Sequence, residues 1–167
     1  MHADDAGVTT ARLTHQATEP AVALARHWVT GFAGRQGMTT PARSDMAVAV
    51  SEAVTNTVRH AYGDDARGDV VVDAASDGEW LTVRVADDGR GGTEDAGSGA
   101  GVRLMRELAD RLELSSGHGG VGTVVLMEFP IPRSVPGPPR TRGAHARRPT
   151  GPRRSGTLSG SPRRAAG

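Results

Sequence analysis

The sequence predicts an α+β fold, a two-layer sandwich in which about three helices cover one face of a mostly antiparallel, mixed sheet. Two segments, 19–36 and 40–62, repeat apolar residues at helical spacing. Two others, 69–75 and 80–86, are rich in valine, and the second alternates apolar and polar side chains, as a strand with one buried face does. Helices and antiparallel strands of this kind bury their apolar faces by packing as two layers.

The first half of the chain is expected to supply a strand and two helices. The strand covers residues 11–17, and the first helix covers residues 19–36 with Pro20 in its first turn. The apolar stripe of this helix consists of Val22, Ala25, Val29 and Phe32. The second helix, 40–62, is expected to start with Thr40 as its N-cap and Pro41 at its first position.

The second half is expected to contain a hairpin, a glycine-rich loop, a helix and a last strand. Asp77-Gly78 is a hairpin-turn signal between the strands 69–75 and 80–86. The glycine-rich residues 87–101 then separate the hairpin from a helix over residues 102–114. The apolar side of that helix consists of Val102, Met105, Leu108 and Leu112. Residues 122–129 form the final strand.

Composition divides the 167 residues into a flexible N-terminus (1–10), a folded domain (11–130) and a disordered tail (131–167). The tail holds nine of the twenty arginines, seven of the ten prolines and no acidic residue. Because it has almost no aliphatic residues, it cannot bury enough apolar surface to offset chain entropy. The chain has no cysteine, which excludes disulfides and thiolate sites. No apolar run approaches the roughly 20 residues needed to cross a bilayer. Since no secretory signal is recognisable, a cytoplasmic location is expected.

Glu52 and Asn56 stand four residues apart, so a helix presents both on one face. Val50, Val54 and Val58 repeat at the same spacing on another face, which is expected to be buried. A carboxylate can accept a proton, and a carboxamide oxygen can bind a hard cation such as Mg²⁺. Taken alone, such a pair is more often two solvated polar residues on an amphipathic helix.

Two glycine clusters lie in the loop region. The first, Asp87-Asp88-Gly89-Arg90-Gly91, ends a strand, and the second, Gly97-Ser98-Gly99-Ala100-Gly101, runs into a helix. Glycine lets the backbone approach a ligand, and the free N–H groups of a helix start can bind a phosphate chain. Asp87 could accept a hydrogen bond from an exocyclic amino group such as that of adenine. The alternative is a surface loop followed by an ordinary helix.

Taken in order, these segments resemble the four boxes of the ATP-binding domain shared by DNA gyrase, the heat-shock chaperone, sensor histidine kinases and the mismatch-repair ATPase. In this Bergerat fold the matching residues are Glu52 and Asn56, then Asp87, Gly89 and Gly91, then Gly97, Gly99 and Gly101, and finally Gly122-Thr123. Within the superfamily the chain is similar to the anti-sigma-factor serine kinases, the RsbW-like proteins. The similarity lies in Ser51–Asn56, His60–Gly63 and Gly101–Met105.

The resemblance implies a protein serine/threonine kinase that uses ATP and Mg²⁺, phosphorylates an anti-sigma-factor antagonist and binds a sigma factor. Glu52 would be the general base and Asn56 the magnesium ligand. Asp87 would read adenine with help from Thr123. The glycines of the boxes, together with Val102, would shape the pocket and cradle the phosphates. A homodimer is expected on the same ground.

Two other functions remain open from the residues alone. The domain could be a catalytically silent ATP-binding module that sequesters a sigma factor or another regulator. The arginine-rich tail could bind nucleic acid or another polyanion by charge, but it has no aromatic residue on which bases would stack. Nucleic acid and membranes are therefore not the expected partners.

Overall fold

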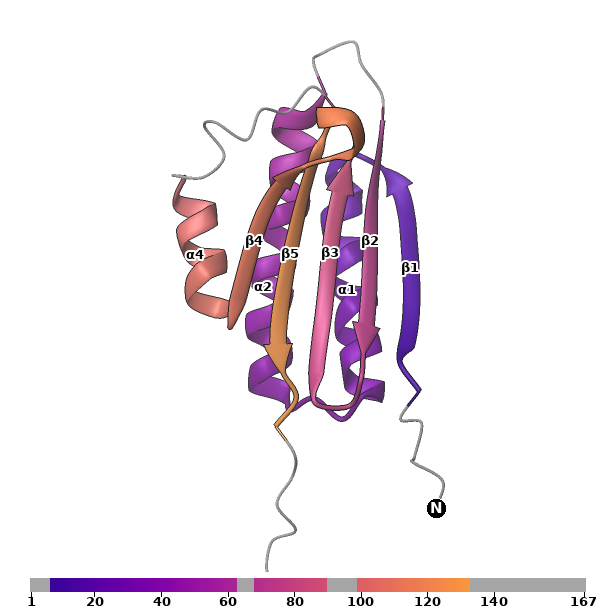
Figure 1. The fold of residues 1–167 in the computed structure, drawn as a ribbon, viewed down its shortest axis with the longest axis vertical. Helices are drawn as coiled ribbons and strands as arrows, with labels where there is room; N and C mark the ends of the chain where they lie inside the picture. The colour runs from indigo at the N-terminus through magenta and orange to yellow at the C-terminus, as the bar shows by residue number, and fades with distance from the viewer. Residues whose placement is uncertain (1–6, 63–67, 90–98, 133–167) are drawn as a thin grey trace, which may run out of the picture. The chain divides into compact units, whose positions relative to one another are not determined.

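The computed structural model describes residues 7–62, 68–89 and 99–132. Five strands are present in these ranges: β1 (Thr9–Gln16), β2 (Asp69–Ser76), β3 (Trp80–Asp87), β4 (Arg111–Ser116) and β5 (Thr123–Pro130). Three α-helices accompany them: α1 (Glu19–Arg35), α2 (Thr40–Asn56) and α4 (Ala100–Leu108). A π-helical turn, η1 (Thr57–Ala61), continues α2, as Figure 1 shows at the upper end of that helix.

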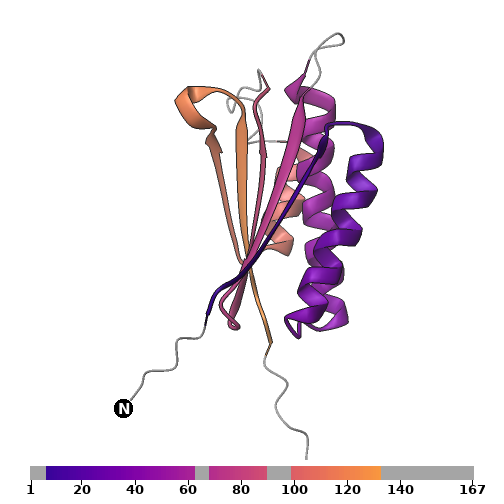
Figure 2. The same cartoon turned by 90° about the vertical axis from the view of Figure 1, so that its right-hand side faces the viewer.

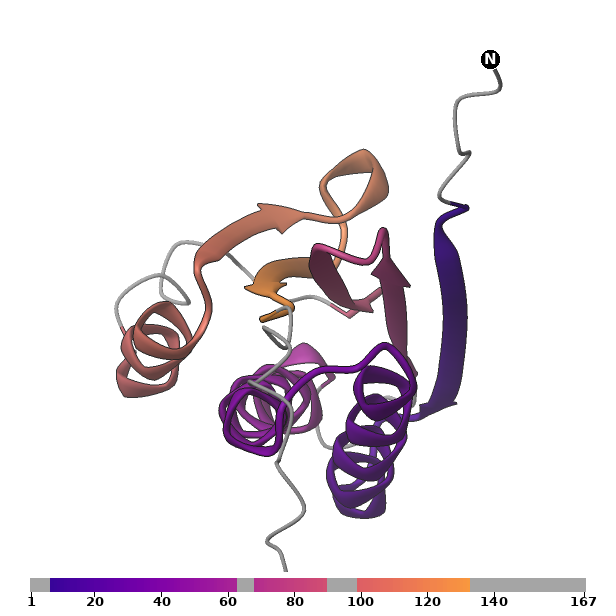
Figure 3. The same cartoon turned by 90° about the horizontal axis from the view of Figure 1, so that it is seen from below.

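The strands form one sheet in the order β1-β2-β3-β5-β4, and every neighbouring pair is antiparallel. All three α-helices lie on the same face of this sheet, which leaves its other face open (Figure 2). Seen from below, α2 lies between α1 and α4 in the helical layer (Figure 3). The predicted α+β sandwich is confirmed, with one difference: the described strands include no parallel pair, so the sheet is antiparallel rather than mixed.

The core lies between the two layers and is built mainly from aliphatic side chains. Val50 and Val54 of α2 are fully buried, as their spacing predicts, and Val58 is half-buried against them. The sheet contributes Leu81, Val83 and Val85 of β3. The large side chains of this core outside β2 and β3 include Phe32, Phe129, Met38, Met46, Met105 and Met127. Both phenylalanines of the chain are therefore buried, and valine, alanine and methionine fill most of the remaining core.

The predicted hairpin between β2 and β3 is present. Gly78 has a φ of 87°, in the left-handed region that favours glycine. The carboxylate of Asp77 accepts hydrogen bonds from the backbone N–H groups of Glu79 at 2.9 Å and Trp80 at 2.7 Å. The bond from Trp80 and, to a smaller extent, the bond from Glu79 hold the pKa of Asp77 below its ordinary value. The turn chemistry therefore fixes the register of the two central strands.

The predicted helix over residues 102–114 is wrong in its second half. Helix α4 ends at Leu108, and Arg111–Ser116 forms β4 at the edge of the sheet. Leu112 fits the helical stripe with Leu108, but it also alternates with Leu114 as strand residues do. Pairing with β5 decides between the two, because β4 then gains a full antiparallel ladder from Arg111↔Glu128 to Ser116↔Thr123.

Several predicted boundaries also shift. The N-cap of α2 is Thr39, not Thr40, and the α-helical geometry ends at Asn56 rather than continuing to residue 62. Strand β1 begins two residues earlier than expected. Ile131, assigned to the tail, is buried and donates its N–H to the carbonyl of Glu79 at 2.8 Å. Residues 1–6 and 133–167 lie outside the described residues.

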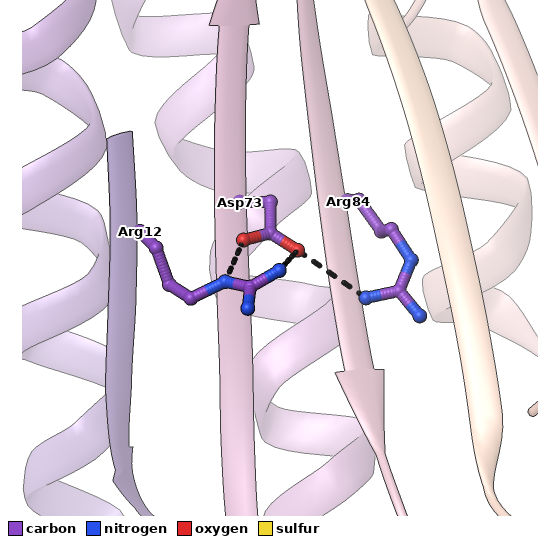
Figure 4. A network of polar contacts seen from close by, with 3 residues as sticks. All are labelled: Arg12, Asp73 and Arg84. Atoms are coloured by element: carbon purple, nitrogen blue, oxygen red, sulfur yellow. Dashed lines mark hydrogen bonds and ion pairs between the residues drawn. The ribbon is translucent and has the colours of Figure 1, made fainter. Parts of the chain in front are cut away.

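The open face of the sheet carries a charged network across three strands (Figure 4). Asp73 on β2 lies between Arg12 on β1 and Arg84 on β3. Its carboxylate accepts hydrogen bonds from both guanidinium groups, at 3.1 Å from Nη2 of Arg12 and at 3.3 Å from Nη1 of Arg84. The hydrogen bond and the charge of Asp73 raise the pKa of Arg12. None of the helices in the described ranges covers this face.

Candidate functional site

Glu52 and Asn56 occupy the last two turns of α2, on a face separate from the one that packs into the core. Both side chains are half-buried, whereas Val50, Ala53 and Val54 on the packing face are buried. The predicted juxtaposition of a carboxylate and a carboxamide one helical turn apart is therefore present. Because neither side chain is fully exposed to solvent, both groups can act on a ligand in a partly dehydrated environment.

The first turn of α4 lies directly against this pair. A β-carbon on Gly101 would lie 2.9 Å from Oε2 of Glu52, 3.7 Å from Nδ2 of Asn56 and 3.9 Å from Oδ1 of Asn56. Helix α4 starts after Gly99 and has no acidic residue in its first turn. The first backbone N–H groups of a helix have no partner within the helix and carry its positive end. A carboxylate, a carboxamide and an anion-binding helix start thus meet at one point.

Asp87 at the end of β3 forms a second cluster. Its Oδ1 accepts hydrogen bonds from the backbone N–H groups of Gly89 at 3.1 Å and Thr123 at 3.2 Å. Its Oδ2 accepts a hydrogen bond from the hydroxyl of Thr57 at 3.2 Å. The structure thus joins Asp87 to Thr123 through the backbone N–H of Thr123, and the expected help of Thr123 in reading adenine stays a prediction. The carboxylate is held at both oxygens.

Two glycines let three backbone segments approach one another beside Asp87. A β-carbon on Gly89 would lie 2.1 Å from the carbonyl oxygen of Ala61, at the end of η1. A β-carbon on Gly122 would lie 2.0 Å from the carbonyl oxygen of Asp87, and Gly122 has a φ of 77°. Only glycine fits either position without moving backbone atoms. Gly89 of the second box and Gly122 of the fourth box therefore allow the backbone to pack closely around the Asp87 carboxylate.

The structure brings most of the predicted site residues into these two clusters. Glu52, Asn56 and Gly101 form one, while Asp87, Gly89 and Thr123 form the other. Val102 is buried in the core, where it anchors α4. A β-carbon on Gly99 would meet nothing within 4 Å, so a side chain at this position would reach neither cluster. Gly91 and Gly97 lie outside the described residues.

Sequence reasoning missed two polar residues of the site. Thr57 is buried at 5% exposure between the clusters. The hydroxyl of Tyr62 lies 2.8 Å from the carbonyl oxygen of Asp69 and 2.5 Å from Oδ1 of Asp88, and these two acceptors share its one proton. A signal for Thr57 was available: it lies four residues after Ala53, on the apolar side of the helix, where a buried hydroxyl needs a partner.

The phenol of Tyr62 is held in its neutral form. Burial raises its pKa, and the hydrogen bond to Asp88 raises it further. The hydroxyl also accepts a hydrogen bond from the backbone N–H of Asp88 at 3.3 Å. Tyr62 therefore connects the end of η1 with the turn that follows Asp87. Arg59 and His60, on the same turn, are exposed.

Two properties of the described residues bear on the kind of site. Across residues 7–62, 68–89 and 99–132, no three His, Cys, Asp or Glu side chains are grouped as metal ligands would be. In those ranges no helix has the length and apolar character required to span a membrane. A cation at this site would therefore need oxygen ligands from a bound molecule in addition to the Asn56 carboxamide.

Comparison with known proteins agrees with this geometry. The model of the histidine kinase-like ATPase domain matches residues 15–129. The chain belongs to this family. The serine-protein kinase RsbW of Bacillus subtilis (strain 168) is 32% identical over 126 residues, which cover 65% of this chain and 78% of that protein. This relationship makes the chain an RsbW-like member of the family.

Other relatives share the domain in larger proteins. Blue-light-activated histidine kinase 2 of Erythrobacter litoralis is 40% identical over 89 residues, 49% of this chain, but the match spans only 26% of that kinase. A solved structure of RsbU and RsbW domains from Mycobacterium tuberculosis superposes with a TM-score of 0.59 at 24% identity. That superposition covers 74% of this RsbW-like chain and 33% of the other, and it supports the fold.

Proposed function

We propose that this RsbW-like chain is an ATP-dependent protein serine/threonine kinase that phosphorylates an anti-sigma-factor antagonist and also binds a sigma factor. The observation that carries the proposal is the meeting of Glu52, Asn56 and the first turn of α4 at Gly101. Phosphoryl transfer needs a base, a metal ligand and a cradle for phosphate, and these three groups can supply them. The name of the Bacillus subtilis relative, serine-protein kinase, supports the same activity.

Each group has a role in the proposed reaction. Glu52 would accept the proton of the serine hydroxyl while the serine oxygen bonds to the γ-phosphorus and the bond to the departing ADP oxygen breaks. Asn56 would hold Mg²⁺ through its carboxamide oxygen. When bound, the metal would supply positive charge that neutralises the charge developing on the phosphates. The positive end of α4 faces the phosphates. Asp87 accepts a hydrogen bond from the adenine amino group, because a carboxylate acts only as an acceptor toward a base edge.

The residues fit a nucleotide-bound metal better than a protein-only metal site. Asn56 offers one hard oxygen, and the described residues hold no cluster of carboxylates or histidines that would complete a coordination shell. The phosphate oxygens of ATP would provide the missing ligands. A cytoplasmic location belongs to the same proposal, since ATP and sigma factors are cytoplasmic. A homodimer belongs to it as well, because the resemblance to RsbW-like kinases implies one.

The test is a transfer assay with γ-labelled ATP, Mg²⁺ and an antagonist protein captured from the native cell. The Glu52→Gln variant should lose transfer by at least about 100-fold, the usual contribution of a general base, while its ATP affinity changes little. Asn56→Ala should weaken binding of ATP only when Mg²⁺ is present. Glu113→Gln is the matched control, because it makes the same chemical change at an exposed position of β4.

The same assay separates the alternative. ATP binding without transfer to any captured partner would favour a catalytically silent module that sequesters a regulator. Transfer that is unchanged in Glu52→Gln would remove this carboxylate from the reaction. A calorimetric titration of the wild-type chain that shows no binding of ATP or ADP with Mg²⁺ would reject the nucleotide site itself.

A further inference from the structure

Thr57 is a buried polar residue at the junction of the two clusters. It follows Asn56 directly and begins the π-helical turn η1. Its exposure is 5%, and its hydroxyl lies 3.2 Å from Oδ2 of Asp87 and 3.4 Å from the carbonyl oxygen of Ala53. The hydroxyl has one proton and the bond to the charged carboxylate is the shorter, so Asp87 is the stronger partner.

The hydrogen bonds to Asp87 leave one acceptor position for a ligand. A carboxylate has about four lone-pair sites. On Oδ1 both are taken, by the N–H groups of Gly89 and Thr123, and on Oδ2 one is taken by Thr57. The remaining site belongs to Oδ2, and its direction depends on where the hydroxyl of Thr57 lies. Thr57 is thus the one side chain among these three donors to the carboxylate, and the only one of the three that contacts Oδ2.

The turn that holds Thr57 is itself fixed against the loop after β3. Thr57 at its start binds Asp87, and Ala61 at its end contacts Gly89 so closely that a β-carbon there would lie 2.1 Å from the Ala61 carbonyl oxygen. Isolated π-helical turns are often associated with functional sites. Here the turn joins the residue after Asn56 to the carboxylate at the end of β3.

We infer that Thr57 is a positioning residue for base recognition: its hydroxyl orients Asp87 so that Oδ2 accepts a hydrogen bond from the 6-amino group of adenine. This inference rests on the proposed nucleotide site. Thr57 touches no part of the nucleotide and acts through Asp87. Its removal therefore lowers discrimination for the amino group specifically, and leaves binding of the triphosphate and metal unchanged.

The experiment compares ATP with purine riboside triphosphate, which lacks the 6-amino group, by calorimetry in the presence of Mg²⁺. Thr57→Val keeps the shape of the side chain and removes the hydroxyl. Its affinity for ATP should fall about tenfold, the effect of one hydrogen bond to a charged group, and its affinity for the analogue should stay within twofold of wild type. Thr57→Ser keeps the hydroxyl and should retain the preference for ATP.

Other results would overturn the inference. An equal loss of affinity for both nucleotides in Thr57→Val would mean a structural role only, and an unchanged preference for ATP would mean that Asp87 is oriented without Thr57. Thr57→Ala gives the same readout if the valine variant does not fold. A wild-type chain that binds neither nucleotide would reject the proposed function, a failure distinct from that of the Thr57 role.

Discussion

Gly101 on α4 lies so close to Glu52 on α2 that a β-carbon at position 101 would come within 2.9 Å of the Glu52 carboxylate. Two helices from distant parts of the sequence therefore meet where one of them has no side chain. The carboxylate is at the end of a flexible side chain, so it can be displaced without moving either backbone. We therefore expect a substitution at position 101 to lower activity while changing the stability of the fold little.

Gly101→Ala should reduce phosphate transfer at least tenfold with little change in stability. The added methyl group displaces the Glu52 carboxylate, while alanine gains up to about 1 kcal/mol of helix propensity over glycine, which offsets the contact. Transfer assays and thermal unfolding measure the two effects. Gly31→Ala on α1 is the control, because a β-carbon there meets only Nη1 of Arg35 at 3.6 Å, an ordinary contact outside the site. Equal transfer by Gly101→Ala and wild type would contradict the assigned role of Glu52.

Gly122→Ala should destabilise the fold by about 2 kcal/mol more than Gly119→Ala, as overpacking typically does. Both glycines have positive φ, 77° and 69°, so both substitutions introduce backbone strain. Only Gly122 has a backbone neighbour in the way, the carbonyl of Asp87 at 2.0 Å from an added β-carbon. Denaturant unfolding of the two variants isolates the clash. Similar unfolding midpoints would show that the Asp87 backbone can move.

Tyr62 should ionise well above its ordinary pKa of 10.0 in the folded protein. Its pKa is raised by folding, so its contribution to stability is complete below pH 10 and is lost as pH rises through the folded pKa. The free energy of unfolding should therefore fall above about pH 10 in wild type and less steeply in Tyr62→Phe. The chain has a single tyrosine, so tyrosinate absorbance reports this group alone.

The titration of Tyr62 has a built-in reference. In denaturant the same tyrosinate signal should appear near pH 10, the value of an unperturbed phenol. Coincident titration curves for the folded and unfolded chain would show that the bonds of Tyr62 to Asp69 and Asp88 do not persist in solution.

Asp73→Asn should produce a small, salt-dependent loss of stability and no change in ATP affinity. The substitution removes the charge that Arg12 and Arg84 share, but exposed ion pairs contribute little and are screened by salt. The network lies on the face of the sheet opposite the helices (Figure 4), whereas Glu52 lies on α2. Unfolding at low and high salt, with a parallel ATP titration, measures both expectations. A weakened ATP affinity would indicate coupling through β3.

Local patterns in the sequence were sufficient for most elements of this fold. The spacing of Val50 and Val54, the alternation in β3 and the Asp77-Gly78 turn depend on neighbouring residues, and the structure contains each of them. The one misassigned element is β4, where Leu112 suits either a helix or a strand. Its assignment needs β5 as a pairing partner, which no local pattern supplies.

The sequence by itself determined which chemical groups are available and which share a helix face: Glu52 beside Asn56, and glycines wherever backbones must approach closely. Only the tertiary structure decided what faces them. It set Gly101 over the carboxylate and the Thr57 hydroxyl on Asp87, 30 residues away. The physical reason is range: side-chain periodicity acts over one or two helical turns, whereas contacts between distant residues arise when the whole core packs.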